Sequence, residues 1–324
     1  MPTQRFVLQH VTTASVLEYS KDQFVKHLER LEKVDPALFA AEFIAKGIPA
    51  IVTDAMHAWP AKDKWTPPYF RHEFGHLGAQ LYDNLFGLQS IRPLGEYIDT
   101  YFDNHQDNPR GYYVRWYVKF KPLDFFWSDD VFQAIIADWS HPYFLPTTSY
   151  VVPFCKPPGT ALAHKNPFPY KGIFISARGG RTRLHRDPFG TDAVLCQFYG
   201  SKRFTFYQPA DDDKLRQGHS YVDPQNPDTH AFPNFIEAQP IYDDELKPGE
   251  ILFIPSGWLH DVVSVSDSIS ITWNFAHAAR RGPFIKEVCD SANNFDRDML
   301  EFFFSAAGHK GLAPNEMARL AQSI

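Results

Sequence analysis

The stretch that decides the fold is GRTRLHRDPFGTDAVLCQF, residues 180–198. It places His185 and Asp187 two positions apart at the start of an apolar run that is typical of a strand. Because residues i and i+2 of a strand point to the same face, the imidazole and the carboxylate are expected to point together. A second His-x-Asp pair, His105 and Asp107, lies among Asn, Pro and Gly, so we assign it to a surface turn.

A second motif supplies a partner for this pair. Gly and Pro punctuate PGEILFIPSGWLH, residues 248–260, where a small barrel must turn between strands, and they orient His260. Two imidazoles and one carboxylate form the ligand set of ferrous sites that keep coordination positions open. The pattern therefore predicts a metal site of His185, Asp187 and His260, against the alternative that His260 is a hydrogen-bonded core residue.

Short strands separated by turn signals surround both motifs. They are GIFISARGG (172–180), AVLCQFYGSKRFTFYQP (193–209), EILFIPSG (250–257) and SISITWNF (268–275). This pattern favours antiparallel strands that close a small barrel. We expect a mainly β fold with α additions, divided into an N-terminal α/β region packed on the barrel (1–171), the barrel core (172–278) and a C-terminal helical tail (279–324).

The flanking regions carry weaker patterns. Apolar spacing predicts helices over residues 20–46 and again after Arg280. Trp59 and Trp65 are expected in the core, and the charge run Asp211–Asp213 is expected on a solvated loop.

Composition restricts the class of protein. Aromatic residues reach 16% of the 324 residues, and the net charge of −6 argues against a protein dominated by non-specific nucleic-acid binding. Three distant cysteines (Cys155, Cys196 and Cys289) form no Cys-x-x-Cys pair, which argues against a disulfide framework and predicts a cytoplasmic location. No signal peptide or membrane span is apparent.

As a set, these motifs resemble the Jumonji-C (cupin-like) iron(II)/2-oxoglutarate oxygenases. The resemblance is to their small hydroxylase branch, which includes the asparaginyl hydroxylase that inhibits hypoxia-inducible factor and the Jumonji lysyl hydroxylase. It covers roughly residues 40–278 and extends upstream to WPAKDKWT, residues 59–66, and to the strand around Tyr113. The matching residues are Thr182, His185-Arg186-Asp187-Pro188, Gly200-Ser201-Lys202-Arg203, the run that ends at His260, Thr272 and Asn274.

The resemblance implies a double-stranded β-helix (jelly-roll) with Fe(II) on His185, Asp187 and His260. Lys202 would then pair with the distal carboxylate of the cosubstrate 2-oxoglutarate, and Thr182 would donate a hydrogen bond to it. The alternatives are a solvated turn lysine at Lys202 and an ordinary strand hydroxyl at Thr182.

Three further residues are implied to support the cosubstrate. Tyr113 and Thr272 would contact it, against the alternative of plain core packing, and Asn274 would support the site. One departure is Leu195, where the lysyl-hydroxylase relatives have a polar amide. Gln197, two residues further along the same strand face, could take its place.

The function expected from the resemblance is hydroxylation of a C–H bond with O2 and 2-oxoglutarate, releasing succinate and CO2. The substrate is expected to be a protein or peptide side chain, with a small molecule or an RNA base as alternatives. An N-methyl-lysine demethylase and a non-catalytic cupin-like binding protein are the other hypotheses. The apolar cluster Phe302–Phe304 suggests either a homodimer through the C-terminal helices or burial within one chain.

Overall fold

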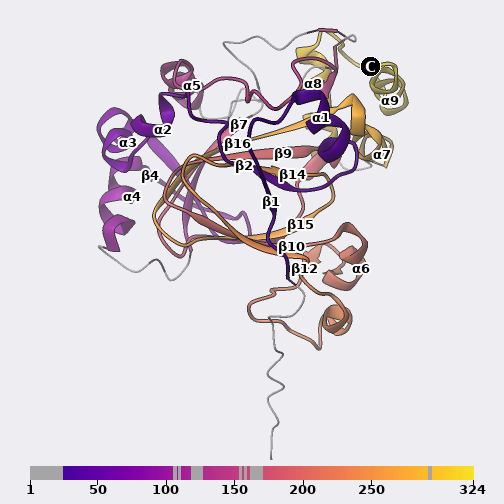
Figure 1. Cartoon of the computed structure of the whole chain (residues 1–324). Coiled ribbons are helices and arrows are strands. Elements are labelled where there is room, and N and C mark those ends of the chain that lie inside the picture. Colours follow the sequence, from indigo (N-terminus) through magenta and orange to yellow (C-terminus); the bar gives the residue numbers. More distant parts are fainter. Residues whose placement is uncertain are drawn as a thin grey trace, which may run out of the picture.

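The barrel consists of two facing sheets, and the chain passes repeatedly from one sheet to the other (Figure 1). The structure, a computed structural model, describes residues 25–104, 108, 111–117, 127–152, 155–156, 159–160, 171–290 and 294–324. Four barrel strands lie side by side in the large sheet, in the order β14-β9-β16-β7: β14 (Ile251–Ile254), β9 (Asp192–Tyr199), β16 (Ser268–His277) and β7 (Lys171–Ser176). The second sheet has the order β13-β10-β15-β8: β13 (Tyr242–Leu246), β10 (Lys202–Tyr207), β15 (Leu259–Ser264) and β8 (Arg181–His185).

This strand order is that of a double-stranded β-helix, so the predicted fold class is confirmed. The centre of the large sheet is covered on both faces, since every residue of β16 is buried. Its sequence, SISITWNFAH, mixes apolar side chains with small polar ones that hydrogen-bond inside the barrel. A strand buried on both faces needs such a composition because unpaired polar groups would be costly there.

The N-terminal region extends the large sheet rather than standing apart from it. Strand β2 (Ala50–Val52) pairs with β14, and strand β5 (Tyr113–Tyr117) pairs with β7. The added strands are β1 (Glu29–Leu31), β2 (Ala50–Val52), β3 (Gly78–Tyr82), β4 (Leu88–Pro93), β5 (Tyr113–Tyr117) and β6 (Tyr150–Val152). The region and the barrel therefore share one sheet, and the three-part division of the chain stays a prediction.

Helices surround the barrel at its ends (Figure 1). The N-terminal ones are α1 (Pro36–Phe39), α2 (Ala61–Lys64), α3 (Pro67–Phe74), α4 (Leu94–Tyr101) and α5 (Trp127–Ile135). The C-terminal ones are α7 (Gly282–Asp290), α8 (Asn294–Ala306) and α9 (Pro314–Ser323). Between β10 and β13 an excursion of the chain forms a lower lobe with α6 (Asp212–Leu215), β11 (Arg216–Gln217) and β12 (Ser220–Tyr221). No helix of the described residues has the length and apolar character that a membrane span needs.

Two expectations about the flanking regions are wrong in part. Residues 29–31 form strand β1, not a helix, because their backbone pairs in parallel with β2. Asp244 adds to this arrangement, since it pairs with Arg30 at 2.9 Å and accepts a hydrogen bond from Leu28 N. Residues 20–24 lie outside the described residues, as do His105 and Asp107. Asp211 is buried, not solvated, and it pairs with Lys214 at 2.8 Å.

The expectation for the tryptophans is confirmed. Trp59 and Trp65 are 6% and 1% exposed and pack in the large core on the ring of Phe198. Their burial anchors the N-terminal helices to β9 of the barrel.

Candidate metal centre

The two predicted histidine ligands are direct partners on adjacent strands. His185 ends β8 and lies opposite His260 of β15 in the antiparallel register, with a bulge directly after His260. Their ring centroids are 4.2 Å apart. Two imidazoles that are 75 positions apart in the sequence are thereby held side by side on one sheet.

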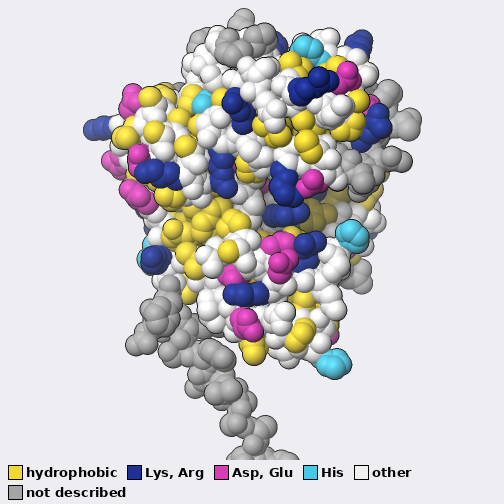
Figure 2. All heavy atoms as spheres, turned by 90° about the vertical axis from the view of Figure 1, so that its right-hand side faces the viewer, with side chains coloured by type: hydrophobic (Ala, Val, Ile, Leu, Met, Phe, Trp, Pro, Cys, Tyr) yellow, Lys and Arg dark blue, Asp and Glu magenta, His cyan; other side chains and the backbone are white. Residues whose placement is uncertain are grey.

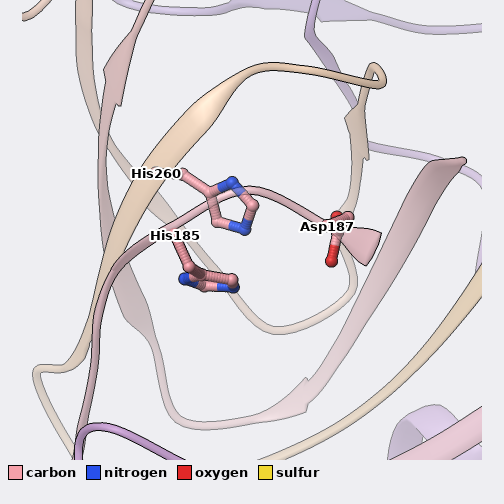
Figure 3. A group of neighbouring side chains, drawn as sticks. All are labelled: His185, Asp187 and His260. Carbon is pink, nitrogen blue, oxygen red and sulfur yellow. The ribbon is translucent and has the colours of Figure 1, made fainter. Parts of the chain in front are cut away.

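Asp187 completes the group. Its backbone stays extended after β8 (φ −63°, ψ 145°), so it keeps the strand alternation that begins at His185. One ligand atom from each of the three residues lies within 4.8 Å of the others. Figure 3 shows the two rings and the carboxylate around a common space.

Both imidazoles are oriented by a hydrogen bond to the backbone carbonyl group two residues before them. Nδ1 of His185 lies 2.9 Å from the carbonyl oxygen of Arg183, and Nδ1 of His260 lies 3.2 Å from that of Trp258. A carbonyl oxygen only accepts, so each Nδ1 carries the proton and each Nε2 lone pair is left for a ligand bond.

The protonation states suit a cation. The pKa of His185 lies well below its usual value, so this ring stays neutral. Burial is the main cause, and the neighbouring His260 is the second. Burial raises the pKa of Asp187, whose Oδ2 accepts no hydrogen bond from the described residues. A divalent ion among the three would satisfy the orphaned oxygen and favour the carboxylate form, and this ligand set fits ferrous iron.

These three side chains line one wall of a cavity of about 290 Å³ between the two sheets. Of the other predicted site residues, Thr182, Lys202, Thr272 and Asn274 also line it. Tyr113 does not: its ring stacks on Phe174, which lines the cavity, at a centroid distance of 6.1 Å. The implied contact between Tyr113 and the cosubstrate stays a prediction.

Lys202 is buried inside the cavity rather than solvated. The turn before it needs a glycine at position 200. The backbone there has φ +61°, and a Cβ atom at this position would lie 1.7 Å from the carbonyl oxygen of Asp267. Lys202 Nζ crosses between the sheets and donates to Ser270 Oγ at 2.8 Å, its single hydrogen-bond partner among the described residues. Burial lowers its pKa to about 7, so an anion entering the cavity would stabilise the ammonium form.

Threonine and asparagine on β16 support this wall. Thr272 Oγ1 donates to the carbonyl oxygen of Val194 at 2.9 Å, and Asn274 Nδ2 donates to Thr191 Oγ1 at 3.2 Å. Asn274 also interacts with Asp187 and favours its charged form, although burial has the larger effect on that pKa. Thr182 faces Val262 of β15 in the register.

The idea that Gln197 replaces the missing amide is wrong. Leu195 lines the cavity, whereas the Gln197 amide donates to the Tyr199 and Gly200 carbonyls at 2.7 and 2.8 Å. Gln197 therefore braces the β9–β10 turn that presents Lys202.

The sequence patterns missed several residues that line the cavity, and two of them act on the metal centre. Arg115 lies over the Phe86 ring at 5.1 Å, and its charge acts on both His185 and Asp187. Phe86, at φ +63° in the β3–β4 hairpin, sets its ring edge-to-face on His185 at 5.0 Å. The position of Arg115, two residues after Tyr113 on one strand, was the only local signal for it.

The model of the cupin-like domain family matches residues 92–281, which is more than half of the chain. This chain belongs to the cupin-like domain family. The matched segment contains all three candidate metal ligands and Lys202.

Curated relatives of this cupin-like chain are distant but extensive. The 2-oxoglutarate and iron-dependent oxygenase JMJD4 of Gallus gallus is 22% identical over 278 residues, 78% of this chain and 60% of the relative. The human JMJD4 is 25% identical, with 74% and 58% covered. The bifunctional arginine demethylase and lysyl-hydroxylase psr-1 of Caenorhabditis elegans is 24% identical, with 73% and 58% covered. The chain therefore spans less than two thirds of the length of these relatives.

Proposed function

We propose that this chain is an Fe(II)- and 2-oxoglutarate-dependent dioxygenase that hydroxylates a C–H bond and releases succinate and CO2. The observation that carries the proposal is the buried His185–Asp187–His260 group in one cavity with Lys202. The names of the JMJD4 relatives support the same chemistry. A binding protein without catalysis has no need for both features together.

The chain's own residues prepare the site. His185 and His260 direct Nε2 away from their backbone hydrogen bonds, and Oδ2 of Asp187 accepts no hydrogen bond from the described residues. Lys202 would bind the distal carboxylate of 2-oxoglutarate. When bound, iron and 2-oxoglutarate supply the oxidising power for the insertion of one oxygen atom from O2.

Apolar side chains make the cavity a dry place for this chemistry. Phe174, Leu195 and Phe204 line it between the charged groups. They exclude water around the metal ligands, which limits side reactions of an activated site.

The substrate that we propose is a protein or peptide side chain. The name of psr-1 as a lysyl-hydroxylase, and that of JMJ22 of Arabidopsis thaliana as an arginine-specific demethylase, support a protein substrate. A cytoplasmic location and a homodimer through the C-terminal helices stay predictions. Light scattering coupled to gel filtration of the full chain would test the second.

Anaerobic titration of metal-free protein with iron(II) and 2-oxoglutarate tests the function. We expect a visible metal-to-ligand charge-transfer band that disappears in His185→Ala and needs at least about tenfold more 2-oxoglutarate in Lys202→Ala, because a charged hydrogen bond is lost. Variants of exposed residues outside the cavity, His219→Ala and Lys247→Ala, serve as matched controls. A folded wild-type protein without the band contradicts the proposal.

A further inference from the structure

The cavity opens beside Arg186 and Pro188. These two are the exposed residues among those that line it, and the rest are half-buried or buried. Arg186 lies between His185 and Asp187 in the sequence, and its charge acts on Tyr221 of the lower lobe and on Lys286 of α7. Arg186, an exposed residue at the rim of the cavity, is therefore open to a substrate that approaches the metal centre from this side.

Figure 2 shows the face of the molecule that carries α6 and α7. Lys and Arg side chains gather near its centre, beside a recess with hydrophobic walls above the lower lobe.

The guanidinium of Arg186 has no ion pair or hydrogen bond with the described residues, unlike its neighbours on β8. Arg181 pairs with Asp261 and Asp223, each at 2.7 Å, and Arg183 lies 3.6 Å from Asp223. The carboxylates near this strand, Asp223 and Asp261, therefore already pair with Arg181 and Arg183. Arg186 keeps all of its donors for a ligand.

The charge of the cavity is opposite to that of the whole protein. Arg115, Arg186 and Lys202 line it against the single carboxylate of Asp187, whereas the chain has a net charge of −6. A positive recess in an acidic protein concentrates the field at its mouth and attracts an anionic group there. The proposed function assigns Lys202 to the cosubstrate and Asp187 to the metal, which leaves Arg186 at the mouth for the substrate.

We propose that Arg186 selects a peptide substrate that carries an Asp or Glu side chain next to the residue that is oxidised. This inference rests on the proposed function and specifies its substrate class. The planar guanidinium matches a carboxylate through two parallel hydrogen bonds. A nucleic acid is the less favourable anion, because the net charge of −6 repels a continuous polyanion.

Fluorescence anisotropy with three labelled pools of short peptides tests the proposal. The pools share a randomised centre and carry Glu, Gln or Lys on both sides, and they bind to the full chain under anaerobic iron(II) and 2-oxoglutarate. We expect the Glu pool to bind tightest, Arg186→Gln to weaken it by about fivefold, and added salt to reduce the preference. Arg186→Glu should make the Lys pool the preferred one.

The matched control is Arg178→Gln, three residues before β8, where an exposed arginine lies outside the cavity. It should bind all pools as the wild type does, and melting curves verify that each variant is folded. Equal binding of the three pools, no binding, a preference that Arg186→Gln leaves intact, or displacement of the Glu pool by a short single-stranded RNA would each overturn the proposal. The charge-transfer band in the same samples reports separately on the proposed function.

Discussion

At the residue scale, burial weakens the charge of two residues in the site. His185 is held neutral, and burial lowers the pKa of Lys202 to about 7. Each of these states costs folding free energy in the empty cavity, because polar side chains lose water without gaining full compensation. A bound metal ion would compensate His185, and a bound anion would compensate Lys202.

Lys202→Met should stabilise the ligand-free protein at neutral pH. The pKa of Lys202 in the folded state, about 7, is below its ordinary value of 10.5, so between these values the unfolded chain binds more protons and stability rises with pH. Below that window the lysine is charged in both states and the cost of burial is complete. The variant should therefore gain on the order of 2–4 kcal/mol near neutral pH and lose this advantage toward pH 10.5.

Urea unfolding at several pH values measures this difference. Lys247→Met, at an exposed lysine, should show no comparable pH-dependent gain. A Lys202→Met protein that is less stable than the wild type at every pH would contradict the prediction.

At the element scale, the pairing of β8 with β15 brings the histidines together. Arg181 secures this pairing, since its guanidinium bonds both oxygens of Asp261 on β15, at 2.9 and 2.7 Å. The same side chain reaches Asp223 in the lower lobe at 2.7 Å. One buried ion-pair network thus connects two strands and the lobe.

Removing Asp261 should be much more damaging than removing Asp223. Asp261→Ala leaves the buried Arg181 with one partner that is itself partly exposed, and we expect a loss of about 3 kcal/mol. Asp223→Ala keeps the bidentate pair and should cost about 1 kcal/mol. The control is Asp243→Ala, whose partner Arg203 is 61% exposed, with an expected change within about 0.5 kcal/mol. Equal losses in all three, measured by urea unfolding, would show that the network does not hold β8 in place.

At the scale of the whole molecule, the C-terminal helices pack back on the barrel. Phe303 and Phe304 are fully buried, against Phe189 and Phe284 respectively. Helix α7 contacts the turn Pro188–Gly190 that directly follows Asp187. Of the two expectations for this apolar cluster, burial within one chain holds for these two residues, and the homodimer is untested.

Phe303→Ala should destabilise the protein by about 3–5 kcal/mol, because it leaves a cavity where the ring supported Phe189. Loosening of the segment after Asp187 should also weaken iron(II) binding in the charge-transfer titration. Ile236→Ala, at a side chain that is 62% exposed, is the control and should leave both unchanged. Full stability of Phe303→Ala would mean that the tail does not support the metal centre.

The amino-acid sequence by itself determined the barrel strands and pointed to His185, Asp187 and His260 as candidate metal ligands, whereas Lys202 came from the resemblance to a known family. The candidate ligands depend on local patterns: strand alternation for His185 and Asp187, and turn glycine and proline residues before His260. Such patterns can be recognised in the sequence because backbone sterics act between residues that are near neighbours along the chain.

Only the tertiary structure decided what lies between distant segments. Residues 29–31 became a strand because they pair with β2, and Asp244, more than 200 positions away, adds hydrogen bonds to Leu28 and Arg30. Arg115 and Phe86 reached the cavity, and Gln197 turned to its own hairpin, through the register of whole strands. Packing and hydrogen bonding between remote strands leave no trace in local spacing, and they set the shape and charge of the cavity.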